Sequence, residues 1–155
     1  MLRVEIPGRE AMCLEHLVLD YNGTIARDGE LIEGVKPRLE ALAEKLEIFV
    51  ITADTHGTAA ENCRDIPVKV LTFPTVRVGE IKAAETKKLP GQAVCVGNGY
   101  NDGAMFAVCA LSIGVIGPEG AWGQLLKSCD VVVNSILDAL DLLLKTDRLR
   151  ATLRT

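Results

Sequence analysis

Short apolar runs that end in polar clusters are the main pattern along this chain. Three of them are residues 16–19 before Asp20, 47–51 before the cluster 52–55, and 92–96 before the cluster 97–102. Continuous apolar runs of this length are typical of strands buried in a parallel sheet. Because the carboxyl ends of such strands meet at one edge, where open α/β sheets bind ligands, we expect the three polar clusters to converge.

Helical periodicity fills the intervals between these strands. Residues 31–46 place Val35, Leu39, Leu42 and Leu46 three or four apart, as on one helix face. The same reasoning predicts an edge strand at 2–6, further strands at 67–72, 110–116 and 130–133, and helices at 57–64, 79–89, 101–109, 119–127 and 135–145. The alternation of strands and helices predicts an α/β fold with a mainly parallel sheet and helices on both faces. The basic tail 145–154 either extends the last helix or docks on the body.

Length and composition narrow the class of protein. The chain has 155 residues, 48% of them hydrophobic, which fits a single domain over 1–155 with a substantial core. A net charge of −4 and 4% aromatic residues argue against nucleic-acid binding. The start lacks a signal-peptide pattern and no apolar stretch reaches the roughly 20 residues of a membrane span, so we expect no membrane insertion.

The cysteines and three isolated residues, Trp122, His16 and His56, say less about the function. The five cysteines form no C-x-x-C pair, which argues against a zinc knuckle or redox dithiol and suits a cytoplasmic protein. Trp122 is interpreted as a helix-start residue packed on the body, with a subunit contact as the alternative. His16 is interpreted as structural. His56 is interpreted in the same way, with substrate contact as its alternative.

The three polar clusters, in their order along the chain, resemble the motifs of the haloacid dehalogenase (HAD) superfamily of aspartyl-phosphate enzymes. Lys82, between the second and third clusters, is part of this resemblance. Residues 20–24, D-Y-N-G-T, resemble its D-x-x-G-T motif, and residues 97–102, G-N-G-Y-N-D, resemble its G-D-G-x-N-D motif. Within the superfamily, the chain is most similar to the phosphorylation domain of P-type ATPases and its free-standing relatives, the soluble P-type ATPase-like phosphatases. The resemblance implies a HAD-like Rossmannoid three-layer sandwich.

Relatives that act on small metabolites often carry a cap domain in one of two intervals between the motifs. Here residues 25–51 and 56–81 are used up by a predicted helix and by a strand–helix unit. We therefore expect no cap domain, and an open site unless a second subunit covers it. A homo-oligomer is a plausible way to close that site.

The resemblance implies catalytic roles for four positions. Asp20 is the expected nucleophile, although an Asp at a strand end also commonly makes an Asx turn. Thr52 and Ala53 are expected to bind phosphate with hydroxyl and amide groups, although a Thr at such a position, taken alone, is more often just a helix-entry residue. Lys82 is expected to neutralise both Asp20 and the phosphate. The alternative lysines, Lys87 and Lys88, follow one to two helical turns later and are typical of a solvent-exposed helix face.

The resemblance also implies a magnesium site, because Mg²⁺ prefers oxygen ligands and keeps several waters. Its expected ligands are Asp20, the backbone carbonyl of Asn22, Asn98 and Asp102. Relatives usually carry an acid where this chain has Asn98, so the neutral amide leaves more of the binding to Asp102. The other interpretation, a plain turn with Asp102 capping the next helix, is compatible with the metal role.

Asn22 is the second departure from the family pattern, because phosphatases usually carry Asp there as the general acid/base, whereas P-type ATPases carry Thr. An amide cannot protonate a leaving group, and general acid–base help is commonly worth about 10²–10⁴ in rate. We therefore expect slow turnover, with aryl and acyl phosphates as the better substrates. We therefore assign Asn22 to the catalytic site but give it no role in proton transfer.

Three functions fit these features. The leading one is a cytoplasmic, Mg²⁺-dependent phosphohydrolase that acts through phospho-Asp20 on a phosphorylated small molecule or protein. The first alternative is a catalytically weakened regulatory or interaction module with the same fold. The second is a detached P-type phosphorylation domain that works with partner subunits, because nothing in the chain resembles a nucleotide-binding domain.

Overall fold

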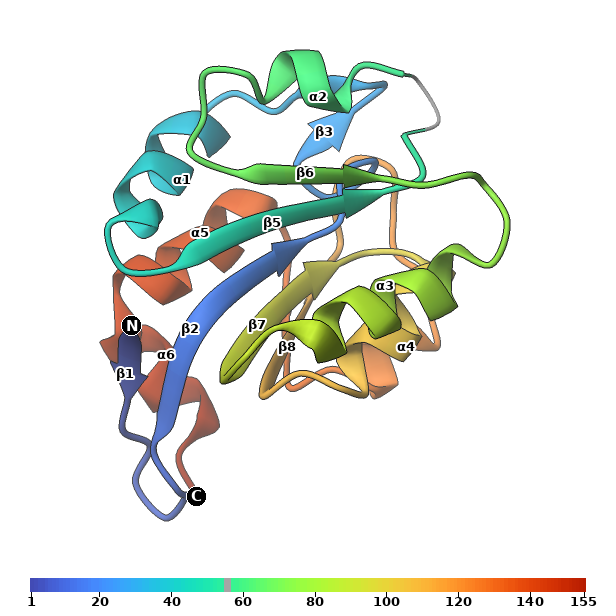
Figure 1. The fold of residues 1–155 in the computed structure, drawn as a ribbon. Helices are drawn as coiled ribbons and strands as arrows, with labels where there is room; N and C mark the ends of the chain where they lie inside the picture. The colour runs from blue at the N-terminus through green and yellow to red at the C-terminus, as the bar shows by residue number, and fades with distance from the viewer. Residues whose placement is uncertain (55–56) are drawn as a thin grey trace.

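The computed structural model describes residues 1–54 and 57–155, which form a parallel sheet with helices on both faces (Figure 1). Thr55 and His56, including the predicted substrate contact of His56, lie outside the described residues. The parallel strands run in the order β6 (Lys69–Thr72), β5 (Glu47–Thr52), β2 (Met12–Leu19), β7 (Gln92–Gly97), β8 (Leu111–Val115) and β9 (Val131–Val133). Strand β1 (Leu2–Val4) pairs antiparallel with the start of β2. The predicted α/β fold with an edge strand at the N-terminus is confirmed.

Strand β2 lies at the centre of the sheet because both of its faces are apolar. Leu17 and Leu19 belong to one core cluster, and Val18 belongs to the other. Leu19 is in register with Val50 of β5 and with Val96 of β7. The three strands therefore end at the same edge, and the residues that follow them are brought together there, as the apolar runs predict.

Two helical layers cover the sheet (Figure 1). One contains α1 (Val35–Ala43), α5 (Ile136–Leu144) and α6 (Thr146–Leu153), whose buried leucines join the larger core cluster. The other contains α3 (Val78–Lys88) and α4 (Gly103–Phe106), with Met105 and Phe106 in the smaller cluster. Short elements complete the fold: α2 (Ala59–Asn62) and the 3-10 turns η1 (Tyr100–Asp102) and η2 (Leu125–Lys127). No helix of the described chain is both long and apolar enough to span a bilayer.

Several predicted helices are shorter in the structure. The one expected at 31–46 begins at Val35, because the preceding residues form a hairpin of β3 (Ala26–Arg27) and β4 (Glu30–Leu31). That hairpin turns through Asp28 and Gly29, both at positive φ. The helix expected at 57–64 spans only Ala59–Asn62. The one expected at 101–109 begins as η1 and ends at Phe106.

The helix predicted at 119–127 is wrong. Only the turn η2 is helical there, and Gly120 has a φ of 76°, which breaks helical geometry. Trp122 is therefore not a helix-start residue; its backbone N–H donates a 2.8 Å hydrogen bond to the carbonyl of Asn98. The basic tail forms α6, separated from α5 by Lys145, and packs on the core through Leu149 and Leu153. Of the two alternatives for the tail, docking is thus the correct one.

Candidate active site

Asp20 lies directly after β2, and its side chain is the centre of a buried polar cluster. Its backbone N–H donates to the carbonyl of Val96, which fixes it at the edge between β2 and β7. The residue is only 6% exposed. One carboxylate oxygen, Oδ1, lies 2.5 Å from Lys82 Nζ, and the other, Oδ2, accepts a 3.0 Å hydrogen bond from Thr24. Both oxygens are therefore held in place by partners from different segments.

Lys82 reaches this cluster from α3 and is 1% exposed. Its ammonium also contacts Asp102 Oδ1 at 2.7 Å and Asn101 Oδ1 at 3.2 Å. Burial acts against the charge of Lys82, but the carboxylates of Asp20 and Asp102 outweigh it and hold its pKa above the usual range. Lys87 and Lys88 are exposed. The structure thus brings Lys82, rather than its two neighbours, to Asp20.

Asp102 is fixed by the backbone of the loop that follows β7. Its Oδ2 accepts hydrogen bonds from the N–H groups of Asn98 at 3.0 Å and Gly99 at 2.9 Å. Burial and the charge of Asp20 raise the pKa of this carboxyl, while Lys82 acts in the opposite direction. A Cβ on Gly97 would lie 2.4 Å from Asp102 Cγ, so only glycine fits at the end of β7. The loop is therefore built around this carboxylate.

Thr24 links the first motif to the third. Its buried hydroxyl donates to Asp20 Oδ2 and to Asn98 Oδ1, at 3.0 and 3.2 Å. Asn98 Nδ2 in turn donates to the carbonyl of Gly120 at 2.9 Å, which fixes the amide orientation. The amide oxygen of Asn98 consequently faces Thr24, which links it to Asp20. Sequence reasoning gave Thr24 no role, although it is the last residue of the D-x-x-G-T motif.

The oxygen donors at this edge fit a hard divalent cation. Asn22 Oδ1 is buried, and no hydrogen-bond partner for it exists among the described residues. With Asp20 and Asp102 both ionised, two carboxylates face the one ammonium of Lys82, which leaves a net negative charge. Within the described chain, no cluster of three or more His, Cys, Asp or Glu side chains is suited to a metal. The backbone carbonyl of Asn22 and the amide oxygen of Asn98 would therefore have to complete a site for Mg²⁺ with the two carboxylates.

Thr52 is the last residue of β5 and Ala53 follows it at the same edge, but Thr52 is engaged locally. Its Oγ1 accepts a 2.9 Å hydrogen bond from the N–H of Asp54. Asp54, at a φ of 45°, in turn accepts hydrogen bonds from the N–H groups of Thr58 and Ala59 at the start of α2. No hydrogen bond between Thr52 and the Asp20 cluster exists among the described residues. The hydroxyl hydrogen of Thr52 remains available, because this oxygen only accepts in the bond to Asp54.

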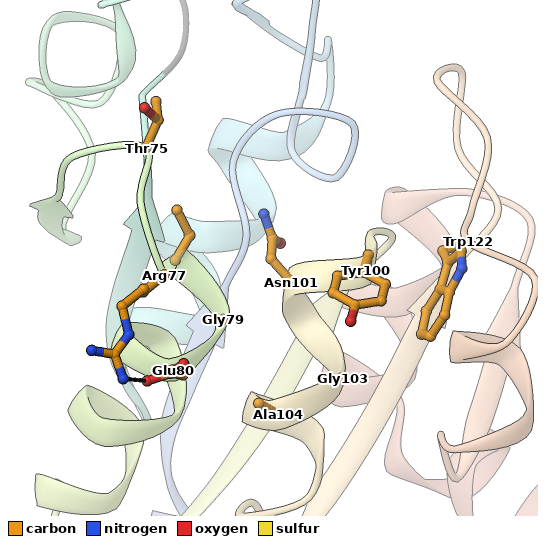
Figure 2. Close-up of a pocket in the computed structure, with 10 residues that line it drawn as sticks. Thr75, Arg77, Gly79, Glu80, Tyr100, Asn101, Gly103, Ala104 and Trp122 are labelled. Carbon is orange, nitrogen blue, oxygen red and sulfur yellow. Dashed lines mark hydrogen bonds and ion pairs between the residues drawn. The ribbon is translucent and has the colours of Figure 1, made fainter.

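A pocket of about 610 Å³ adjoins the cluster, between the start of α3 and the loop after β7 (Figure 2). Asn101 belongs to both, since it lines the pocket and contacts Lys82. Tyr100 and Trp122 form one side of the pocket. Sequence reasoning missed Asn101 as a contact of Lys82; its place inside the third motif was the available signal. Sequence reasoning could not place Trp122 beside the pocket, because the helix predicted at 119–127 is absent from the structure.

Comparison with known proteins identifies two archaeal relatives by sequence. No protein-family model matches this chain. It is 42% identical over 85 residues to the uncharacterized protein MJ0073 of Methanocaldococcus jannaschii, a match that covers 53% of this chain and 91% of that protein. It is 56% identical over 39 residues to MJ0072 of the same organism, covering 25% of this chain and 89% of that protein.

Solved structures with the same fold include two sugar-phosphate phosphatases. The cobalt-bound deoxy-D-mannose-octulosonate 8-phosphate phosphatase of Haemophilus influenzae has a TM-score of 0.71 at 14% identity, over 92% of this chain and 94% of that one. The Moraxella catarrhalis 3-deoxy-D-manno-octulosonate 8-phosphate phosphatase, in complex with magnesium, phosphate and KDO, has a TM-score of 0.68 at 17% identity, over 91% and 94%. A zinc-transporting PIB-type ATPase has a TM-score of 0.63 at 20% identity, over 79% of this chain and 20% of that one. At these identities the likeness establishes the fold.

Proposed function

Because this chain belongs to the same family as MJ0073 and has the fold of the HAD superfamily, we propose that it is a Mg²⁺-dependent phosphohydrolase acting through an aspartyl phosphate on Asp20. The observation that carries the proposal is the buried carboxylate of Asp20, held 2.5 Å from the ammonium of Lys82 at the edge of the sheet. Structural neighbours that are phosphatases, with cobalt or magnesium bound, support the same reaction class.

The proposed reaction has two steps at one carboxylate. Asp20 attacks the phosphorus of a phosphate ester, so that an oxygen–phosphorus bond forms and the bond to the leaving oxygen breaks. The leaving group departs with the bonding electrons. Water then cleaves the aspartyl phosphate, which releases inorganic phosphate and restores Asp20. Lys82 offsets negative charge at Asp20 and at the phosphoryl oxygens throughout.

The phosphoryl group needs additional positive charge and donors. Asp20, Asn22, Asn98 and Asp102 would hold Mg²⁺, which stabilises negative charge on the phosphoryl oxygens when bound. Thr24 positions the first of these carboxylates and the amide of Asn98 toward one another. We assign the free hydroxyl hydrogen of Thr52 and the backbone at Ala53 to phosphate binding.

Asn22 sets the substrate preference in this proposal. Its amide cannot protonate a departing alkoxide, so esters of poor leaving groups should react slowly. Aryl and acyl phosphates release an oxygen that departs without a proton, and they should be the better substrates. All five cysteines are free thiols, as suits a reducing compartment, and we place the proposed enzyme in the cytoplasm.

The test is hydrolysis of phenyl phosphate and acetyl phosphate with Mg²⁺ by the unmodified protein and by Asp20→Asn. Asp65→Asn, at an exposed loop position, is the matched control. We expect metal-dependent turnover that persists in the control and is lost in Asp20→Asn. Turnover that persists in Asp20→Asn would rule out Asp20 as the nucleophile.

A regulatory module is the second candidate, and the amides at Asn22 and Asn98 are the observation that favours it, because phosphatases of the family usually carry acids at both positions. It predicts equal, negligible rates for the unmodified protein and Asp20→Asn. It also predicts that the chain still binds inorganic phosphate or a phosphorylated partner. A detached phosphorylation domain would instead need a partner subunit for turnover.

A further inference from the structure

The pocket beside the cluster is concave and of ligand size. Its volume of about 610 Å³ falls in the range of about 300–1,000 Å³ typical of small-molecule sites. Gly79 of α3 and Gly103 and Ala104 of α4 line part of it with little or no side chain. A Cβ on Gly79 would lie 3.1 Å from the carbonyl oxygen of Asn101, so a larger residue there would crowd the helices. Gly79 thus allows α3 to approach the backbone of Asn101 closely at this edge of the pocket.

Two aromatic rings form one side of this pocket (Figure 2). Tyr100 and Trp122 meet edge to face, with ring centroids 4.7 Å apart. They remain 75% and 39% exposed, although large aromatic residues usually bury their rings. The backbone bond from Trp122 to Asn98 ties this aromatic pair to the loop that carries Asp102. The pair is therefore a fixed apolar surface beside the polar cluster.

Asn101 connects this pocket to the reacting group. It lines the pocket, and its Oδ1 lies 3.2 Å from the ammonium of Lys82, which itself lies 2.5 Å from Asp20. The leaving group of a phosphate ester at Asp20 has to project away from the carboxylate. Through Asn101, this pocket adjoins the cluster from which that group departs.

The paired charged residues of the pocket leave it without a net charge. Arg77 and Glu80 line its other side and pair with each other, so that their charges cancel (Figure 2). Both side chains are mostly exposed. The uncharged side chains that line the pocket include the aromatic pair, the amide of Asn101 and the hydroxyl of Thr75. This chemistry suits an uncharged planar ring.

We propose that this pocket is the leaving-group site of the enzyme and that it binds the aromatic ring of an aryl phosphate against Tyr100 and Trp122. The inference rests on the proposed function. Attack by Asp20 forms a bond between its carboxylate oxygen and phosphorus, and it breaks the bond between phosphorus and the oxygen attached to the ring. The ring departs as a phenolate with that electron pair and takes its proton afterwards from water. An aryl leaving group therefore matches both the pocket and the lack of an acid at Asn22.

Trp122 is the only tryptophan in the chain, so its fluorescence reports on this pocket directly. In Asp20→Asn with Mg²⁺, phenyl phosphate should change the emission saturably, whereas inorganic phosphate, which has no ring, should not. Tyr100→Ala should weaken phenyl phosphate binding about 3- to 10-fold, the usual value of one aromatic contact. Val132→Ala, at an exposed position on β9, is the matched control and should leave it unchanged.

Steady-state kinetics provides the second readout. Tyr100→Ala should lower kcat/KM for phenyl phosphate by a similar factor and leave that for acetyl phosphate unchanged. Equal effects on both substrates, or emission that does not respond to phenyl phosphate, would overturn the pocket assignment while hydrolysis by Asp20 stands. Ring-dependent emission without any turnover would support the pocket and contradict the hydrolase. A phosphotyrosine peptide, tested beside phenyl phosphate, distinguishes a protein side chain from a small ester as the source of the ring.

Discussion

Asn22 is the residue whose replacement should raise the rate of the proposed reaction. Its amide is close in shape to a carboxylate, and its Oδ1 is buried without a partner among the described residues. Asn22→Asp should therefore raise turnover of phenyl phosphate, by up to about 10²–10⁴. Steady-state rates measure this, with Asn22→Ala as the control that gains no acid. An Asn22→Asp protein that is folded but no faster would contradict the role given to this position.

Gly97 is the residue whose replacement tests the loop geometry. A Cβ there would lie 2.4 Å from Asp102 Cγ, so Gly97→Ala should displace Asp102, reduce turnover and cost about 1–3 kcal/mol of stability. Gly123→Ala is the matched control, because nothing lies within 4 Å of its added Cβ. Thermal unfolding and hydrolysis are the measurements. Equal unfolding temperatures for the two variants would contradict the close packing of Asp102 against Gly97.

The sequence predicts part of this residue-scale arrangement. Strand ends and motif order place Asp20, Lys82 and Asp102 at one edge, and the structure brings them into contact. The bridge from Thr24 to Asn98 depends on side-chain directions that spacing does not specify. The local bond from Asp54 to Thr52 arises from a left-handed backbone at Asp54, which no pattern in the chain signals.

At the scale of elements, one ion pair joins α1 to α5. Arg38 donates to both carboxylate oxygens of Asp141, at 2.8 and 3.2 Å, and these bonds lower the pKa of that carboxyl. A lowered folded-state pKa stabilises the protein above the unfolded value of about 3.9, and that gain is lost as the pH falls through the folded value. Asp141→Asn should therefore lower Tm at neutral pH, and the difference should begin to shrink at about pH 4 and disappear once the pH is below the folded-state pKa.

This pH dependence is measured as Tm against pH for the unmodified protein, Asp141→Asn and the exposed control Asp65→Asn. The control should follow the unmodified protein throughout. A deficit of Asp141→Asn that stays constant into strong acid would show that the side chain acts by packing and not by its charge.

Helix α1 and the segment 119–127 show why elements differ in predictability. The leucines of α1 repeat at helical spacing and are buried, so pattern and structure agree. In 119–127, Gly120 takes a left-handed conformation and the N–H of Trp122 bonds to Asn98 instead of a helical partner. A contact made across the fold thus outweighs the local pattern, which contains no sign of it.

For the molecule as a whole, one core cluster joins the two ends of the chain. It includes residues of β1, such as Leu2 and Val4, and of α6, such as Leu149. Leu149→Ala should therefore cost about 2–5 kcal/mol, because this side chain is fully buried. Leu144→Ala, at a partly exposed position, should cost much less. Denaturant unfolding compares the two, and equal costs would mean that α6 is not part of the core.

The overall topology was predictable because each strand and each helix shows its own pattern of hydrophobic residues in the sequence. The intervals between the motifs hold the hairpin β3–β4 with α1, and then α2, β6 and the start of α3. Neither interval of the described chain contains a further domain, so the fold leaves the edge near Asp20 without a cap. The pocket proposed as the leaving-group site was not predictable, because it exists only where α3, α4 and the loop of Trp122 meet.

The most direct test of the account is the mass of the intact protein after brief incubation with acetyl phosphate and Mg²⁺. Because Asn22 cannot activate water, the covalent intermediate should persist long enough to be trapped by acid. The account predicts a gain of one phosphoryl group, located on the peptide that contains Asp20 and absent from Asp20→Asn. Turnover without this adduct, or with the phosphoryl group on another residue, would contradict it.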